Sequence, residues 1–414
     1  MRISLTLALA LAIFALPSDA AACGGCFAPV GSVSVVNAHR MALLSAPTGS
    51  VLWDQIQYTG SPEDFVWVLP VAGTPTVEVA DNGFFEALNQ TTTIQMVAPR
   101  PPQTFCPGSY CYRAAAAADA GASRSDASIP VNVYHEGVVG PYETATIGSS
   151  DSTALVTWLR DHGYEVSADL MPTIDYYVGL HMNFIALRLA PTAGIDRMTP
   201  VRVAMPGLAL TLPLRMIAAG VTDEVSLELF VFSEARMEAA NFGNAEVDRS
   251  AVTFDWSSRT FDYDARFDDA LFSGTGVLNN WVTEYAQLAQ LYYLASYTSG
   301  YGADVHSARA DVQIVSDALP QAYLTRLRTR LPPSQLGTDL TLRLSNGAPI
   351  AASFNVMREL HRQPDVVCPA MPTCPTDGPG AAGGGCAVHG RGAGAPWAIA
   401  AMMIGLALAR RSRS

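Results

Sequence analysis

The fold is decided by VLWDQIQY at residues 51–58 and FVWVL at residues 65–69. The first stretch alternates, with Ile56 on one face and Gln55 on the other, as in a strand with one buried face. The second is apolar on both faces, which is typical of a strand covered on both sides, and Pro70 ends it. Because the intervening TGSP is a turn-forming sequence, the two stretches predict antiparallel sheet.

Further strands are predicted where the same alternation returns. The segments are 184–189, 225–232 and 323–331. The last carries three arginines on one face, Arg326, Arg328 and Arg330. Such a ladder either grips an anionic glycan or phosphate, or forms a solvated sheet edge that discourages aggregation between strands. The edge is the commoner arrangement.

Helices are predicted where apolar residues recur at helical spacing. The positions are Phe84, Phe85 and Leu88; Leu155, Trp158 and Leu159; and Trp281, Tyr285, Leu288 and Tyr292, which step by four, three and four. Asp81 is placed to cap the first helix and residues 150–152 to cap the second, which Gly163 ends. Together the patterns predict an α+β fold, a mostly antiparallel β-sheet region with two or three packed helices.

Three longer stretches carry a family resemblance. They are IQYTGSPEDFVWVLPVAGTPTVEV at 56–79 soon after CGGCF at 23–27, ALVTWLRDHGYEV at 154–166 with YYVGLHMNFIALRL at 176–189, and AYLTRLRTRLPPSQLGTDLTL at 322–342. Together they resemble the domain of unknown function 2330 family of exported bacterial proteins, over roughly residues 23–345. That family has no established activity, so the resemblance implies export and supplies no catalytic residues. The chain departs from the family at Cys26, because the family's second early cysteine lies further along.

The N-terminal residues 1–22 predict a secretory signal peptide. Arg2 precedes an apolar core at 3–16, and small residues stand before Cys23. Acylation of Cys23 is a disfavoured alternative, because Ala20 stands where a lipobox has leucine. The mature chain is therefore expected outside the cytoplasm.

The C-terminal residues 396–414 predict a hydrophobic sorting or anchor segment. An apolar run at 397–409 precedes three cations, Arg410, Arg411 and Arg413, that hold the chain end on the cytoplasmic side. The run is too short to span the bilayer alone, which takes about 20 residues. With Cys386 upstream, the tail resembles the MYXO-CTERM sorting segment, which implies cleavage near the cysteine and surface retention. An ordinary tail anchor with an incidental Cys386 is the alternative.

Between these ends, residues 23–363 are expected to form the extracytoplasmic α+β region. Ala-rich residues 114–128 carry few bulky side chains and predict a flexible surface loop. Residues 364–395 are rich in Pro, Gly and Ala and predict a stalk that holds the folded region off the membrane.

Cysteine spacing predicts disulfides in an exported chain. The close pairs are Cys106 with Cys111 and Cys368 with Cys374, and a strained third pair is Cys23 with Cys26. Half a zinc site at the last pair is a weaker alternative, because no second close Cys or His pair accompanies it. The partner of Cys23 stays open, and Cys386 is left for processing.

Composition excludes one class of partner. The net charge is −12 and every basic side chain is arginine, so the clustered cations that nucleic acid requires are not expected. The weak metal candidate is an acidic group, Asp262, Asp264, Asp268 and Asp269, beside SGTG at 273–276. Calcium prefers such oxygens. However, the spacing fails the EF-hand pattern, and the aromatic residues between the acids favour a strand with a solvated polar face.

No catalytic or cofactor motif occurs in the sequence, and no cofactor is expected. The seven histidines are scattered and form no recognised ligand pattern. The sequence therefore favours a noncatalytic binding or structural protein of the cell envelope, whose partners are the membrane, through its C-terminal segment, and the sorting machinery. The alternative is a surface hydrolase with a site assembled from distant residues.

Overall fold

The computed structural model describes residues 26–27, 38–55, 66–103, 137–148, 150–162, 166, 170–191, 193–194, 198–218, 224–274, 276, 278–298 and 305–367. These fall into two compact units. The first unit contains every helix and strand given below. In the second unit the described residues are Gln103 and Asp365–Val367, where the Gln103 amide donates to Asp365 at 2.8 Å.

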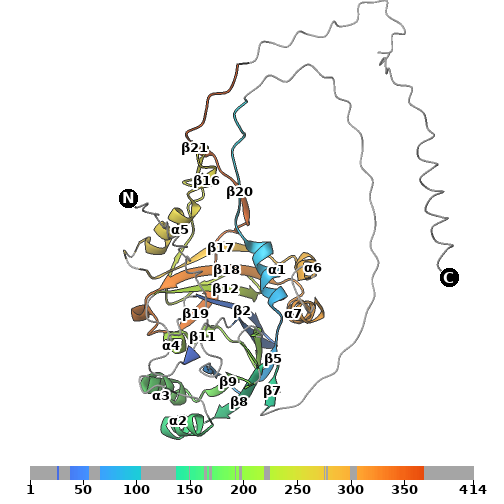
Figure 1. Ribbon diagram of the computed structural model, residues 1–414, viewed down its shortest axis with the longest axis vertical. Coiled ribbons are helices and arrows are strands. Elements are labelled where there is room, and N and C mark those ends of the chain that lie inside the picture. Colours follow the sequence, from blue (N-terminus) through green and yellow to red (C-terminus); the bar gives the residue numbers. More distant parts are fainter. Residues whose placement is uncertain are drawn as a thin grey trace, which may run out of the picture. The chain divides into compact units, whose positions relative to one another are not determined.

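Two packed β-sheets with helices on their outer faces form the centre of the first unit (Figure 1). The larger sheet has eight strands in the order β14-β17-β18-β12-β2-β3-β10-β5. Their bounds are β14 Gly243–Ala245, β17 Asn280–Leu288, β18 Tyr323–Leu331, β12 Val225–Ser233, β2 Ala38–Ala46, β3 Gly49–Gln55, β10 Val201–Met205 and β5 Thr76–Val79. The pairs β12/β2 and β14/β17 are parallel, and the other pairs are antiparallel.

The smaller sheet has five antiparallel strands in the order β1-β4-β9-β8-β7. Their bounds are β1 Cys26–Phe27, β4 Val66–Val71, β9 Asn183–Leu189, β8 Tyr142–Gly148 and β7 Gly137–Val139. The main core fills the space between the sheets. For example, Met41 and Leu43 of the larger sheet share one buried cluster with Trp67 and Leu69 of the smaller sheet.

Helices cover the outer face of each sheet. Helices α1 (Asn82–Thr92), α6 (Leu291–Tyr297) and α7 (Val305–Ala318) bury the face of the larger sheet that carries Trp53 and Phe230. Helices α2 (Ser152–Asp161) and α3 (Met171–Gly179) bury the outer face of the smaller sheet. The first unit is therefore a four-layer α/β/β/α arrangement.

Short elements complete the first unit. They are the sheet β11 (Thr211–Leu212), β19 (Leu340–Leu344) and β13 (Met237–Ala239); the sheet β16 (Thr260–Phe261), β15 (Thr253–Asp255) and β21 (Arg358–Leu360); the pair β20 (Ser353–Asn355) and β6 (Gln95–Val97); helices α4 (Leu214–Ile217) and α5 (Tyr263–Phe272); and the 3-10 helix Pro333–Gln335. Helix α5 packs its own small core against β15 and β17.

The predicted α+β class is confirmed, although more helices pack on the sheets than the expected two or three. Strand β4 is buried on both faces, as FVWVL predicts, because Trp67 faces the core between the sheets and Val68 faces α2 and α3. Pro70 does not end this strand, which continues to Val71 in register with β9. Within the described residues the pairing of β1 reaches only Trp67, so no described residue pairs with Pro70 on that side of β4.

The first two helix predictions are confirmed. Asp81 caps α1 by accepting a hydrogen bond from the Gly83 amide, and Asp151 caps α2. Strands β9, β12 and β18 cover the three alternating segments.

The predicted helix at 281–292 is wrong. Residues 280–288 form strand β17, and α6 begins only at Leu291. A β-bulge between Thr283 and Tyr285 places Trp281 and Tyr285 on opposite faces of the sheet. Their spacing of four residues in the sequence therefore does not reflect a shared helix face.

Several predictions fall on residues outside the described ranges. They are the signal peptide, the pairings of Cys23, Cys106, Cys111, Cys368 and Cys374, the loop at 114–128, the stalk beyond Val367, Gly163, and the tail with Cys386, Arg410, Arg411 and Arg413. Cys26 is described by its backbone alone, which pairs with Trp67. Within the described ranges no helix is both long and apolar enough to cross a membrane.

Candidate functional site

An apolar cleft opens at one end of the space between the two sheets. Its volume is about 580 Å³, which lies within the roughly 300–1,000 Å³ of small-molecule sites. Its floor is made by buried Leu43, Leu52 and Leu69 of β2, β3 and β4. Leu180 and Leu208 lie at its margin and are 54% and 57% exposed. Apolar side chains therefore line the cleft from floor to margin.

Two charged residues stand among the described residues that line this cleft, Arg215 and Asp339. Asp339 Oδ1 accepts hydrogen bonds from the Tyr177 hydroxyl at 2.6 Å and from the Arg215 amide at 3.1 Å. Burial, followed by the hydrogen bond to Asp339, raises the pKa of Tyr177. Asp339 is therefore held by two donors and fixes α3 and α4 at the cleft wall.

The Arg215 guanidinium has a different environment. Its central carbon lies 4.0 Å from the centre of the Tyr176 ring, which is a cation–π contact. Its Nε is buried without a hydrogen-bond partner, and within the described ranges the guanidinium makes no ion pair. Buried Leu214 and Met216 on either side anchor the short helix α4 and fix this position. The cleft therefore has one cation that no carboxylate of the described chain neutralises.

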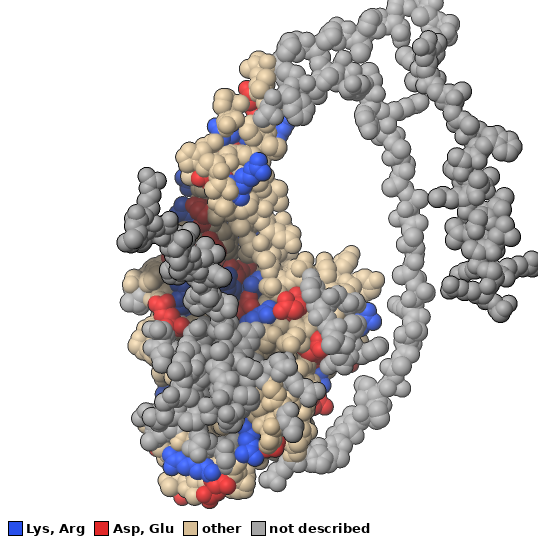
Figure 2. All heavy atoms as spheres, in the orientation of Figure 1, with Lys and Arg blue, Asp and Glu red and all other residues tan. Residues whose placement is uncertain are grey.

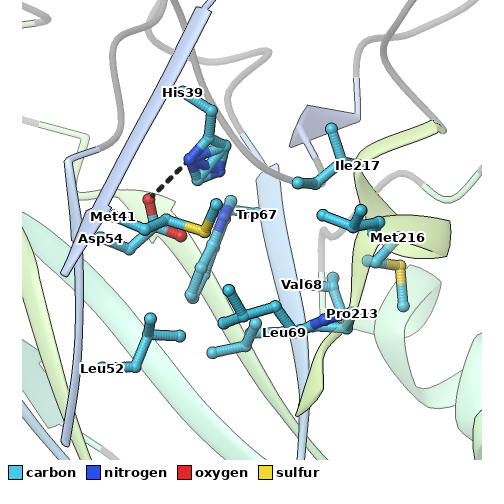
Figure 3. A pocket seen from close by; sticks show the side chains of 12 residues that line it. His39, Met41, Leu52, Asp54, Trp67, Val68, Leu69, Pro213, Met216 and Ile217 are labelled. Atoms are coloured by element: carbon cyan, nitrogen blue, oxygen red, sulfur yellow. Dashed lines mark ion pairs between the residues drawn. The ribbon is translucent and has the colours of Figure 1, made fainter. Parts of the chain in front are cut away.

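A smaller cavity shares part of its wall with the cleft, at Leu52, Leu69 and Leu212. Its volume is about 20 Å³. Figure 3 shows the imidazole of His39 and the carboxylate of Asp54 facing each other, with Trp67 beside them. His39 Nδ1 lies 3.3 Å from Asp54 Oδ1, and both side chains are fully buried.

The His39–Asp54 pair is held in an apolar environment. Burial lowers the pKa of His39 to about 3 and raises the pKa of Asp54 well above its usual value. Both directions have the same cause, because charge is disfavoured where water is excluded. Below the raised pKa of Asp54, the carboxyl therefore keeps its proton while the imidazole of His39 is neutral, and the pair carries no net charge. The cavity accommodates little more than one water molecule, so a substrate has no room beside the imidazole in this arrangement.

A chain of alternating acids and arginines crosses the helix-covered side of the larger sheet. Glu228 contacts Arg40 at 3.0 Å and also pairs with Arg326. Glu284 accepts from Arg328 at 3.0 Å and lies 3.6 Å from Arg326. In Figure 2 acidic and basic atoms lie together in a recess near β17 and β18.

This chain of charges corrects the interpretation of the arginine ladder as a sheet edge. Strand β18 lies inside the sheet, between β17 and β12. Arg326, Arg328 and Arg330 do share a face, but each has a carboxylate partner. Arginines that are already paired with carboxylates are poorly suited to bind a further anion. We therefore assign the series of acid–arginine ion pairs a structural role.

The acidic group proposed for calcium lies on a helix, so the predicted strand is wrong. Asp262 precedes α5 and pairs with Arg266, which also contacts Asp269. Asp268 pairs with Arg330, and Asp264 lies in the first turn of α5. Over the described ranges no three His, Cys, Asp or Glu side chains are grouped so that they could hold a metal. The arrangement gives calcium no geometric support.

The fold and the cleft can now be compared with known proteins. A family model described as "Uncharacterized protein conserved in bacteria (DUF2330)" matches residues 17–343. The chain belongs to this family. The DUF2330 match includes every described residue that lines the cleft, and it confirms the resemblance carried by the sequence motifs. No curated protein matches the chain. No solved structure matches it either.

Sequence reasoning missed Arg215, Asp339 and the His39–Asp54 pair of this DUF2330 protein. One signal was present for the first, because Arg215 interrupts the apolar segment LALTLPLRMIAA at 208–219. A single cation inside an apolar segment costs free energy unless it is paired or used. No comparable local signal marks His39 and Asp54, which only the pairing of β2 with β3 brings together.

Proposed function

We propose that this chain is an exported, noncatalytic binding protein of the cell envelope, and that the cleft between the sheets holds a ligand with an apolar part. The observation that carries the proposal is the cleft itself, with a buried leucine floor and exposed leucines at its margin. Apolar side chains exposed around a concave apolar surface are typical of ligand sites.

Export and retention at the surface rest on the sequence. The signal peptide at 1–22 supports export, and the tail at 396–414 with Cys386 supports retention. A binding protein held at the envelope surface would meet amphiphilic molecules there. This setting fits the apolar cleft.

Binding is favoured over hydrolysis by the position of the titratable groups. A hydrolase needs an acid or base within hydrogen-bond reach of the scissile bond. Tyr177 and Asp339 line the cleft, but the Asp339 carboxylate already accepts from the Tyr177 hydroxyl and the Arg215 amide. His39 and Asp54 lie behind the wall that the cleft shares with the adjoining cavity, whose volume of about 20 Å³ leaves them inaccessible to a substrate.

The test uses a neutral apolar dye, N-phenyl-1-naphthylamine, whose fluorescence rises in apolar surroundings. We expect saturable binding to the full chain, one dye per molecule. Leu208→Glu places a charge at the margin of the cleft and should weaken binding at least tenfold. The matched control is Leu344→Glu, because Leu344 is 63% exposed and does not line the cleft. Absence of binding, or equal losses in both variants, would overturn the proposal.

A further inference from the structure

We infer that the ligand of the cleft is a single-chain amphiphile with one anionic head group, and that Arg215 is the residue that selects the anion. The inference rests on the proposed function, since it names the ligand class of the same cleft. It is carried by the juxtaposition of an apolar cleft and a guanidinium without a carboxylate partner among the described residues.

The first step of the argument concerns desolvation. Arg215 is half-buried, and its Nε is shielded from water without an acceptor. Leaving donors of a charged group without a partner costs free energy. The terminal nitrogens of the half-buried guanidinium also have no acceptor among the described residues, and a carboxylate or phosphate oxygen of a ligand would accept from them. Such charge-assisted bonds are about twice as strong as neutral ones.

The second step concerns geometry. The Arg215 guanidinium rests on the Tyr176 ring, and the backbone amide of Arg215 is bonded to Asp339. Both contacts hold the cation in one place before any ligand arrives. A preorganised planar guanidinium suits the two oxygens of a carboxylate or phosphate better than a flexible ammonium does.

The third step concerns size and charge. A volume of about 580 Å³ suits one ligand of drug size, which favours one apolar chain over two. Asp339 is the acidic residue among the described lining, and it opposes a second negative charge nearby. Asp339 therefore favours a head group with a single charge.

The experiment compares two ligands with the same chain, palmitoleate and palmitoleyl alcohol, as displacers of the neutral dye from the full chain. We expect the parent protein to prefer the carboxylate at least tenfold over the alcohol. Arg215→Gln should abolish this preference while the affinity for the alcohol stays within about twofold. Arg215→Lys keeps the charge but loses the planar fork, so an intermediate preference is expected.

Two further variants serve as controls. Asp339→Asn removes the opposing charge and should strengthen carboxylate binding. Arg343→Gln removes an arginine that lies outside the cleft, and it should change neither affinity. The tail at 396–414 is identical in all variants, so differences between them report on the cleft and not on the tail. Unchanged thermal unfolding of Arg215→Gln would show that the fold is kept.

The outcomes separate the two proposals. If the dye and both ligands bind without a preference for the carboxylate, the anion-selecting role of Arg215 is wrong and the binding function stands. If neither the dye nor the alcohol binds, the proposed binding function is wrong, and the inference about Arg215, which rests on it, is wrong as well. A lysophospholipid with one phosphate charge, used as a third displacer, distinguishes a lipid head group from a free fatty acid. Loss of its binding in Arg215→Gln supports the same site.

Discussion

The indole Nε1 of Trp53 donates a hydrogen bond of 2.8 Å to Asp311, across the boundary between the larger sheet and helix α7. The same carboxylate pairs with Arg202 of β10. Asp311 is fully buried, and burial raises its pKa although Arg202 acts in the opposite direction. One carboxylate thus connects α7 with two strands of the sheet.

Replacing this carboxylate should be costly. Asp311→Ala leaves the Trp53 indole and part of the Arg202 guanidinium without an acceptor, and loss of one partner of a buried pair costs about 3–5 kcal/mol. Urea unfolding measures the change in free energy. Glu78→Ala is the control, because Glu78 pairs with the same arginine but is 62% exposed. It should cost about 1 kcal/mol or less, and similar losses in both variants would contradict the assignment.

The buried end of the acid–arginine chain leads to a second prediction. Glu284 is 1% exposed and accepts hydrogen bonds from Tyr263 at 2.9 Å and from Arg328 at 3.0 Å. Glu284→Ala should therefore destabilise the protein by about 3–5 kcal/mol. Arg330→Ala, at the exposed end, should cost about 1 kcal/mol or less. Thermal unfolding of both variants tests this contrast. An unchanged melting temperature in Glu284→Ala would show that the series of acid–arginine ion pairs does not stabilise the fold.

The pH dependence of stability reports on His39 and Asp54. In the unfolded chain these groups titrate near 6.5 and 3.8, whereas the folded pKa of His39 is about 3 and that of Asp54 is raised. The histidine alone destabilises the fold as the pH falls from 6.5 towards 3, because the unfolded chain then binds the additional proton. The aspartate alone stabilises the fold below pH 3.8, and this stability is lost as the pH rises through its folded pKa.

Between pH 3.8 and 6.5 the two contributions oppose each other in the parent protein. Asp54→Asn leaves the histidine alone, so its stability relative to the parent should rise with pH across this window. His39→Gln leaves the aspartate alone, and its relative stability should fall. Urea unfolding at a series of pH values gives both slopes. Parallel profiles for the three proteins would show that the pair does not hold the protonation states assigned to it.

The C-terminal tail leads to a prediction about sorting. If Cys386 directs processing, Cys386→Ala should accumulate an unprocessed form that is held in the inner membrane or mislocalised, with the extracytoplasmic region still folded. Mass spectrometry of the C-terminus and protease accessibility on intact cells measure the two effects. Truncation before Gly383 should release an exported, soluble protein. An unchanged C-terminal mass and unchanged surface exposure in the Cys386→Ala protein would leave an ordinary tail anchor.

The sequence predicts strands and helix N-caps well where the local pattern of apolar and polar residues matches the burial in the fold. FVWVL reads as a doubly covered strand because its apolar residues fill both faces of one sheet. The pattern fails around Glu284, the additional residue of the bulge in β17, because an insertion inverts the alternation of side chains after it. It also fails in α5, where Tyr263, Phe267 and Ala270 form the buried helical stripe. In that segment the aspartates between the aromatic residues are also typical of the polar face of a strand, so the sequence pattern favours the wrong element.

The candidate site was less predictable than the fold. The cleft is made by segments far apart in the chain, and its cation is separated from Asp339 by more than a hundred residues. Whether an arginine is neutralised depends on which carboxylates the topology brings near it. Neither Arg326 nor Arg215 has an acidic residue close to it in the sequence, yet the first has two acidic partners in the fold and the second has none within the described residues.

The parallel pairing of β12 with β2 joins strands whose residues lie nearly two hundred positions apart. On its other side β12 pairs with β18, which comes almost a hundred positions later. The middle of the larger sheet therefore cannot assemble until residue 331 is available to fold. Contacts of such long range slow folding, and until then β12 has an unpaired apolar edge, which is prone to aggregation. A chain interrupted before β18 should therefore misassemble and would not yield a smaller stable domain.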